Sequence, residues 1–149
     1  MKDRIDRFRK ILKAKETARD LVRKELAELK RQEEAFLDHL RELRDEKLEY
    51  IRRFENIASG NVTIEGLRIG SEDISRTEDR IKEGIVKVLR LRKKMETVEA
   101  ALLEKHRDVR KVETYLLQME LQWEKECLRK EQMAVDEIAG MLHHRRGEN

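Results

Sequence analysis

The residue types that most often carry chemistry are few in this chain. It has four histidines and one cysteine among 149 residues, and only His143 and His144 are neighbours. Adjacent residues on a helix point about 100° apart, so these two imidazoles would make a poor metal-binding pair. Cys127 has no base or helix N-terminus near it in the sequence that would activate its thiol. We interpret the histidines as solvated surface residues and the cysteine as part of a packed helical seam.

Signals for nucleotide chemistry and acid–base catalysis are also absent. None of the six glycines precedes the Lys-Ser or Lys-Thr pair of a phosphate-binding loop. Acidic residues occur along the whole chain, but two carboxylates that act as acid and base need a cleft that alters their surroundings. Long helices offer no such cleft. We therefore predict that the chain is not an enzyme, has no catalytic residues and uses no metal, cofactor or small-molecule substrate.

The composition favours long helices over a rounded core. Charged residues make up 45% of the chain and aromatic residues 4%, and there is no proline. The 35 basic and 32 acidic residues leave a net charge of +3, and they are mixed along both halves, as is typical of solvated helix faces. Proteins that bind nucleic acid usually gather Lys and Arg on one side. We predict no nucleic-acid partner, and binding to nucleic acid or a lipid surface through the basic excess stays an alternative.

Nothing in the sequence indicates secretion or a membrane span. A single cysteine cannot form an internal disulfide, which is typical of a reduced compartment. The first residues lack an apolar signal core, and no apolar run approaches the roughly 18 to 20 residues of a membrane span. We expect a soluble, cytoplasmic protein.

The first half of the chain carries apolar residues at heptad spacing. Two sets of positions spaced by seven run from Ile5 to Phe54 and from Phe8 to Ile57, and twelve of these sixteen positions are apolar. A repeat of this kind predicts a helix that joins a left-handed coiled coil. No helix breaker precedes residue 59. The first helix is therefore expected over about residues 3–58.

A turn is expected over about residues 59–63. Gly60 is placed for a left-handed C-terminal cap, and Asn61 also tolerates turn conformations. Thr63 can cap the second helix, and Ser71, which two acidic residues follow, is a rival start. We prefer Thr63, because an unbroken heptad set of apolar residues begins four positions later.

The two halves can be paired in register. If the residue numbers of facing positions sum to 124, Phe54 faces Gly70 and Leu40 faces Gly84, so that each large side chain meets a small one. A slip of one heptad would keep most apolar positions of the two halves facing one another and stays an alternative. Trp123 is the last residue of the repeat and is expected to plug the final layer, and an anchor in an interface is the alternative role for it.

The predicted fold class is all-α, a long two-helix antiparallel coiled-coil hairpin with a C-terminal helical overhang. We expect a single domain over residues 1–149, with the second helix over about residues 64–144 and a short disordered tail. The seam that holds the two helices together is expected to contain Val22, Leu29, Phe36, Leu43, Tyr50, Ile74, Ile81, Val88, Met95, Leu102, Val109 and Leu116.

The overhang, expected over about residues 124–144, begins where the first helix provides no further partner. After Trp123 the apolar repeat changes phase by four residues, which is a stutter in the coiled-coil pattern. Within the overhang, one helical face gathers Ala134, Ile138, Met141 and Leu142. An unpaired apolar face indicates a docking site or a fraying end, and we favour docking. A structural coiled coil that self-associates through this face is an alternative of another class.

Three short segments give the chain a family resemblance. The basic opening from Ile5 to Glu16, the Leu48-Glu49-Tyr50 segment before a glycine-containing turn, and Arg129-Lys130-Glu131 followed by Asp136-Glu137-Ile138-Ala139 occur at corresponding places. With these landmarks, the chain resembles the FliJ family of flagellar type III export proteins over nearly its full length. The related injectisome family, YscO, shares the same plan and is the nearest rival.

The resemblance implies a stalk in a hexameric export ATPase ring that also contacts the membrane export gate. Such a protein would be held at the cytoplasmic face of the inner membrane through the export apparatus, with escort of export chaperones as a further role. The implied ATPase-binding residues are Ile5, Phe8, Leu12, Arg129, Glu131, Asp136, Ile138 and Met141. The implied gate-binding stripe maps to Asp73, Thr77, Arg80 and Gly84, which are polar or small where relatives carry apolar or aromatic residues.

Overall fold

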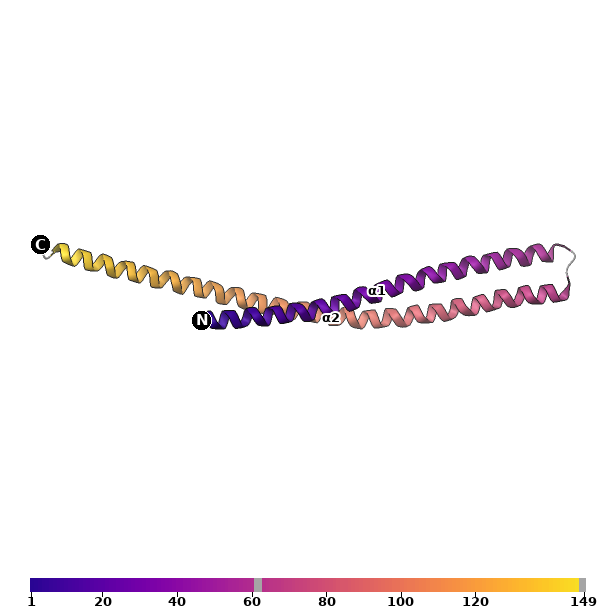
Figure 1. Cartoon of the computed structure of the whole chain (residues 1–149), viewed down its shortest axis with the longest axis horizontal. Helices are drawn as coiled ribbons and strands as arrows, with labels where there is room; N and C mark the ends of the chain where they lie inside the picture. The colour runs from indigo at the N-terminus through magenta and orange to yellow at the C-terminus, as the bar shows by residue number, and fades with distance from the viewer. Residues whose placement is uncertain (61–62, 148–149) are drawn as a thin grey trace. The chain divides into compact units, whose positions relative to one another are not determined.

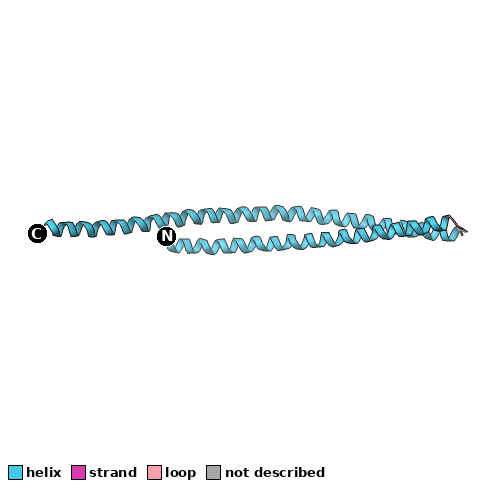
Figure 2. Cartoon of the chain, turned by 90° about the horizontal axis from the view of Figure 1, so that it is seen from above, coloured by secondary structure: helices cyan, strands magenta, loops and turns pink. Residues whose placement is uncertain are grey.

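The chain folds into two long α-helices. The computed structural model describes residues 1–60 and 63–147, in which α1 spans Lys2–Ala58 and α2 spans Ile64–Gly147 (Figure 1). The two helices pack against each other, and the described residues contain no strand (Figure 2). The all-α hairpin fold predicted from the heptads is therefore confirmed.

Contacts divide the chain into two compact units, each built from both helices. The terminal unit comprises Met1–Asp20 and Leu103–Asn149, and the central unit comprises Leu21–Leu102. Each unit has its own cluster of buried apolar side chains.

The second helix begins as the capping residue predicts. The side-chain oxygen of Thr63 accepts a hydrogen bond of 3.1 Å from the backbone N–H of Gly66, which is the usual role of an N-cap. The carbonyl oxygen of Thr63 accepts a further bond of 3.2 Å from the N–H of Leu67. The start at Thr63 is confirmed, and the rival start at Ser71 is wrong because α2 already contains that residue.

The first helix ends without a left-handed glycine. No glycine among residues 1–60 and 63–147 has a positive φ, so the conformation predicted for Gly60 is wrong. Its N–H instead donates to the carbonyl oxygen of Ile57 at 3.2 Å, and the hydroxyl of Ser59 donates to the carbonyl oxygen of Asn56 at 2.9 Å. A tightened last turn and a serine hydroxyl thus satisfy carbonyl groups that a left-handed cap would otherwise serve. The turn conformation expected of Asn61 lies outside the described residues.

The last turn of α2 extends beyond its predicted end. His144, Arg145 and Arg146 are helical, and cations at a helix C-terminus are stabilised by the helix dipole. The disordered tail predicted after residue 144 is therefore wrong up to Gly147, and residues 148–149 lie outside the described part of the chain.

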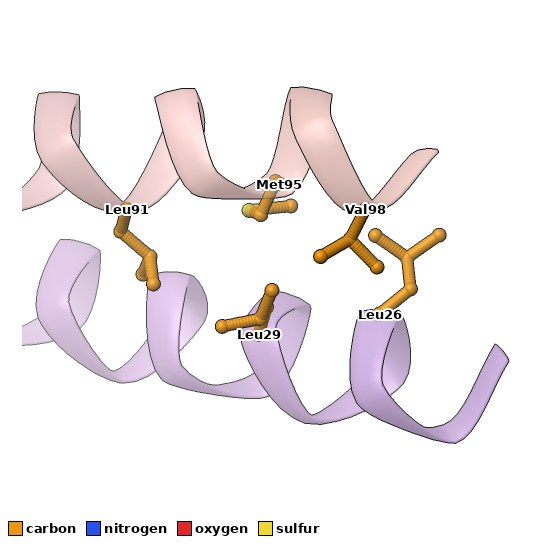
Figure 3. Close-up of a cluster of buried hydrophobic side chains, with 5 residues drawn as sticks. All are labelled: Leu26, Leu29, Leu91, Met95 and Val98. Atoms are coloured by element: carbon orange, nitrogen blue, oxygen red, sulfur yellow. The ribbon is translucent and has the colours of Figure 1, made fainter. Parts of the chain in front are cut away.

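The core of the central unit is the heptad seam itself. Leu26 and Leu29 of α1 point toward Leu91, Met95 and Val98 of α2 (Figure 3), and all five side chains are buried. Half-buried side chains pack against this cluster, namely Val22, Phe36 and Leu102. Buried heptad positions on both helices supply the apolar area that stabilises the pair.

Two glycines establish the register of the central unit. A Cβ atom placed on Gly70 would lie 2.9 Å from Cδ2 of Phe54, and one on Gly84 would lie 2.5 Å from Cδ2 of Leu40. These are the two large-to-small pairs that the sum of 124 predicts. The slip of one heptad is excluded for this unit, because it would place each large side chain opposite a different residue.

Charged residues at seam positions are tolerated because their ends reach the opposite helix. Lys47 of α1 forms an ion pair with Glu78 of α2 at 3.2 Å, and Glu33 pairs with Arg92 at 3.4 Å. Their stems cover the seam while the charged groups stay near solvent. Such exposed pairs contribute little to stability, but they avoid the cost of burying an unpaired charge.

The terminal unit has a second cluster around Ile5, Leu116 and Met119, which are all buried. Phe8, Leu12 and Trp123 pack against it, so the predicted plug at Trp123 is confirmed. The ring of Phe8 stacks on Tyr115 with centroids 5.7 Å apart, and Arg9 reaches Glu120 at 3.1 Å. These contacts attach the first turns of α1 to α2.

The close packing at Gly84 leads to a stability prediction. Gly84→Leu is expected to lower the free energy of unfolding by about 1–3 kcal/mol, because the added side chain overpacks the seam against Leu40. The matched variant, Gly140→Leu, should not lower it, because nothing lies within 4 Å of a Cβ at that glycine and leucine is the better helix former. Urea unfolding followed by circular dichroism measures both variants. Equal effects of the two substitutions would contradict the packing described here.

Candidate interaction surface

The C-terminal part of α2 is exposed on every side. All side chains from residue 128 to residue 147 are exposed, and within the terminal unit α2 continues past the first residues of α1 (Figures 1 and 2). The overhang predicted from the change of phase after Trp123 is thus a helix with solvent around it. Backbone hydrogen bonds within the helix satisfy its polar groups, whereas its apolar side chains remain without packing.

The apolar face of the overhang is a continuous strip. Ile138 and Met141 are 58% and 67% exposed, and Leu142 is 54% exposed. Ala134 lies one turn before Ile138 on the same face and is also exposed. Large aliphatic side chains this exposed, grouped on one helix face, are typical of a surface that a partner covers.

Sequence reasoning missed a second row beside this face. Leu121, Leu128, Val135 and Leu142 recur at intervals of seven residues, and each is at least half exposed. The row begins before the overhang, where α2 still packs against α1 through its opposite side. The sequence does contain this seven-residue repeat. It is easily overlooked because the stronger repeat that ends at Trp123 accounts for the seam. The apolar surface is therefore wider and longer than the four residues first predicted.

Three charged residues predicted to bind a partner lie on the same exposed helix. Arg129, Glu131 and Asp136 are solvent-exposed, and none of them makes an ion pair with another residue in the described ranges. Their charges are therefore available to a partner. Glu131 lies among the aliphatic residues of the strip, so a complementary surface would offer a cation there.

The N-terminal residues predicted for the same role are placed differently. Ile5 is 4% exposed, and Phe8 and Leu12 are half-buried against the cluster that contains it. In the isolated chain these three side chains pack the end of the terminal unit. Their side chains are therefore less accessible than those of the overhang.

The residues assigned to the gate-binding stripe are also mostly covered. Thr77 is 3% exposed, and its hydroxyl donates to the carbonyl oxygen of Asp73 at 2.9 Å. Asp73 is half-buried, and its Oδ1 lies 3.7 Å from Nη2 of Arg76. Gly84 packs directly against the side chain of Leu40. Arg80 is the one exposed side chain of these four.

The twelve predicted seam residues are all buried or half-buried. Leu29, Leu43, Val88, Met95, Val109 and Leu116 are the buried members. Each remaining member keeps part of its side chain accessible at the edge of the helix pair.

The electrostatics give little sign of a reactive centre. Arg31 donates a 2.7 Å hydrogen bond that lowers the pKa of Glu28, but both groups lie at the surface. Across residues 1–60 and 63–147, no group of three or more His, Cys, Asp or Glu side chains is arranged to hold a metal ion. No helix in the described part of the chain is long and apolar enough to cross a membrane.

The arrangement suits protein recognition. A packed helix pair that continues into a long unpaired helix defines a coiled-coil protein. Comparison with protein families agrees: the model of the flagellar FliJ protein family matches residues 4–148. The chain belongs to this family, whose members are components of flagellar type III export. Comparisons with curated proteins and with solved structures gave no match.

Proposed function

We propose that the chain is a coiled-coil stalk of the flagellar type III export apparatus that binds the hexameric export ATPase ring through the overhang. The observation that carries the proposal is the exposed aliphatic strip of Ile138, Met141 and Leu142 on a helix without packing. The family role supplies the class of partner.

The strip provides the chemistry that a groove on a partner requires. Full burial of one large aliphatic side chain contributes about 1.5–3 kcal/mol. The three anchors together therefore offset a large part of the roughly 4–15 kcal/mol that association costs, and further contacts of the interface supply the rest. The spacing of these residues is that of a helix laid in an apolar groove. Arg129, Glu131 and Asp136 then add specificity at the rim, where charged groups select a partner and its orientation.

Attachment to the membrane export gate and escort of export chaperones belong to the same proposal. Arg80 is the residue of the gate-binding stripe whose side chain is free to make a first contact. Binding through Thr77 or Gly84 would require the helix pair to open locally. The gate would hold the stalk at the cytoplasmic face of the inner membrane, and no catalytic step is assigned to the chain.

The stoichiometry of the complex tests the proposal. A stalk in the centre of a ring implies one chain for each ATPase hexamer. Calorimetric titration of the whole chain into the cognate export ATPase, under conditions in which the ring is assembled, should therefore end near one chain for six subunits. One chain for each subunit, or no binding to the assembled ring, would contradict the central position.

A further inference from the structure

One segment of α2 concentrates positive charge. Residues 82–94 contain six Lys or Arg side chains and one acidic residue, Glu83, so the segment carries +5 while the whole chain carries +3. The rest of the chain is therefore slightly acidic. Charges that look well mixed over the full length are locally unbalanced here.

Most of these cations are unpaired. Arg92 pairs with Glu33 of α1 at 3.4 Å. The other five make no ion pair with any residue in the described ranges, namely Lys82, Lys87, Arg90, Lys93 and Lys94. Elsewhere in the central unit many arginines have a carboxylate within one helical turn, such as Arg41 with Asp38 and Arg68 with Glu65. The segment thus presents charge that the protein itself does not neutralise.

Aliphatic side chains lie among these cations on the face that points away from α1. Val88, Leu91 and Met95 are buried in the seam (Figure 3 shows the last two), whereas Val86 and Leu89 are 46% and 57% exposed. Ile85 lies beside the seam, where it lines a hollow with Leu37 and Leu40 of α1. Helical spacing places Lys82, Val86, Leu89 and Lys93 on the side opposite the seam. Lys82, Val86 and Arg90 line one shallow hollow together with Lys87 and Glu83.

We propose that residues 82–94 bind the surface of an anionic lipid bilayer. Lys and Arg side chains near such a surface are attracted by its negative potential, and aliphatic side chains between them enter the boundary between headgroups and acyl chains. The face is the convex outer side of one helix, and a flat bilayer can meet it without a groove. A docking helix of a partner would need an apolar groove instead.

Nucleic acid fits this surface less well than lipid. Proteins that bind single strands stack bases on aromatic side chains, and residues 82–94 contain none. The two exposed aliphatic side chains of this face, Val86 and Leu89, have no favourable partner on a phosphate backbone, but they do in a bilayer.

Sedimentation of the whole chain with vesicles tests the proposal. We expect binding to vesicles that contain equal parts phosphatidylglycerol and phosphatidylcholine, and none to vesicles of phosphatidylcholine alone. Lys82→Glu with Lys93→Glu should weaken this binding by at least about thirtyfold, because each cation contributes roughly fivefold near an anionic surface. Val86→Gln with Leu89→Gln should also weaken it, without any change of charge.

The N-terminal helix supplies a charge-matched control. Residues 2–15 hold seven Lys or Arg and two Asp, which is again +5, but their apolar residues Ile5, Phe8 and Leu12 pack in the terminal unit. Lys10→Glu with Lys13→Glu should change vesicle binding by less than about threefold, because these side chains lie outside the proposed surface. Circular dichroism establishes that all variants keep their helices.

Three results would overturn the proposal. If Lys82→Glu with Lys93→Glu and Lys10→Glu with Lys13→Glu weaken vesicle binding equally, the binding is general electrostatic attraction and not a property of residues 82–94. Unchanged binding of the Gln variant would remove the aliphatic residues from the surface. Displacement of the vesicles by duplex DNA or RNA at physiological salt would assign the surface to nucleic acid. The test is independent of ATPase binding, which involves the other unit of the chain.

Discussion

Replacing Ile138 and Met141 together with aspartate is expected to weaken binding to the export ATPase by at least about a hundredfold, or about 3 kcal/mol. In a partner's groove both side chains become buried anchors, and carboxylates in their place would be desolvated without a counter-charge. In the free chain the same side chains are 58% and 67% exposed. The melting temperature should therefore stay nearly unchanged.

Calorimetric titration and thermal melts of the same preparations measure the two effects. Gln122→Asp with Gln132→Asp is the matched control, because it adds the same charge to exposed positions of α2 that carry no aliphatic side chain. The control should keep most of the ATPase affinity. A large drop in melting temperature for the Ile138 and Met141 variant would mean that the overhang packs against another copy of the chain. Unchanged affinity and stability would remove the strip from the interface.

The second large effect is expected in the core of the central unit. Leu29→Ala should lower the free energy of unfolding by about 2–5 kcal/mol, because it removes three buried carbon atoms and leaves a cavity beside Leu91 and Met95. Leu21→Ala makes the same chemical change at a side chain that is 64% exposed, so it should cost less than about 0.5 kcal/mol.

Chemical unfolding in urea compares the two alanine variants directly. The midpoint should fall clearly for Leu29→Ala and remain near that of the parent protein for Leu21→Ala. Similar midpoints for both variants would contradict the packing of Leu29 in the seam, since Leu29 lies between the helices and Leu21 does not.

The heptad repeat predicted the fold well, because burial between two helices demands one apolar position every three to four residues. Leu29 and Met95 could be paired from sequence alone once Gly70 and Gly84 were matched with bulky partners. The backbone conformation of Gly60 is harder to predict. Glycine tolerates a left-handed cap, but the local hydrogen bonds decide whether such a cap forms.

The candidate site was harder to predict than the fold. Ile5 belongs both to the heptad repeat and to the N-terminal segment of the family resemblance, and heptad position alone cannot separate a seam residue from a binding residue. Leu121 and Leu128 were overlooked for the complementary reason, since exposure on the outer face becomes visible only after the seam is located. The charge of residues 82–94 can be counted from the sequence, but whether ion pairs neutralise these cations is visible only in the structure.

The continuity of α2 has a consequence for how the overhang forms. Starting a helix from unfolded chain carries a nucleation penalty of about 10⁻³, equivalent to about 4 kcal/mol, whereas each further residue added to an existing helix is close to neutral. The paired turns beneath Trp123 provide that nucleus, so the overhang only has to propagate from it. A partner consequently receives a helix whose initiation cost is already met by the packing of Ile5, Leu116 and Met119. Loosening that cluster is expected to fray the distant strip, although none of the residues of the strip is changed.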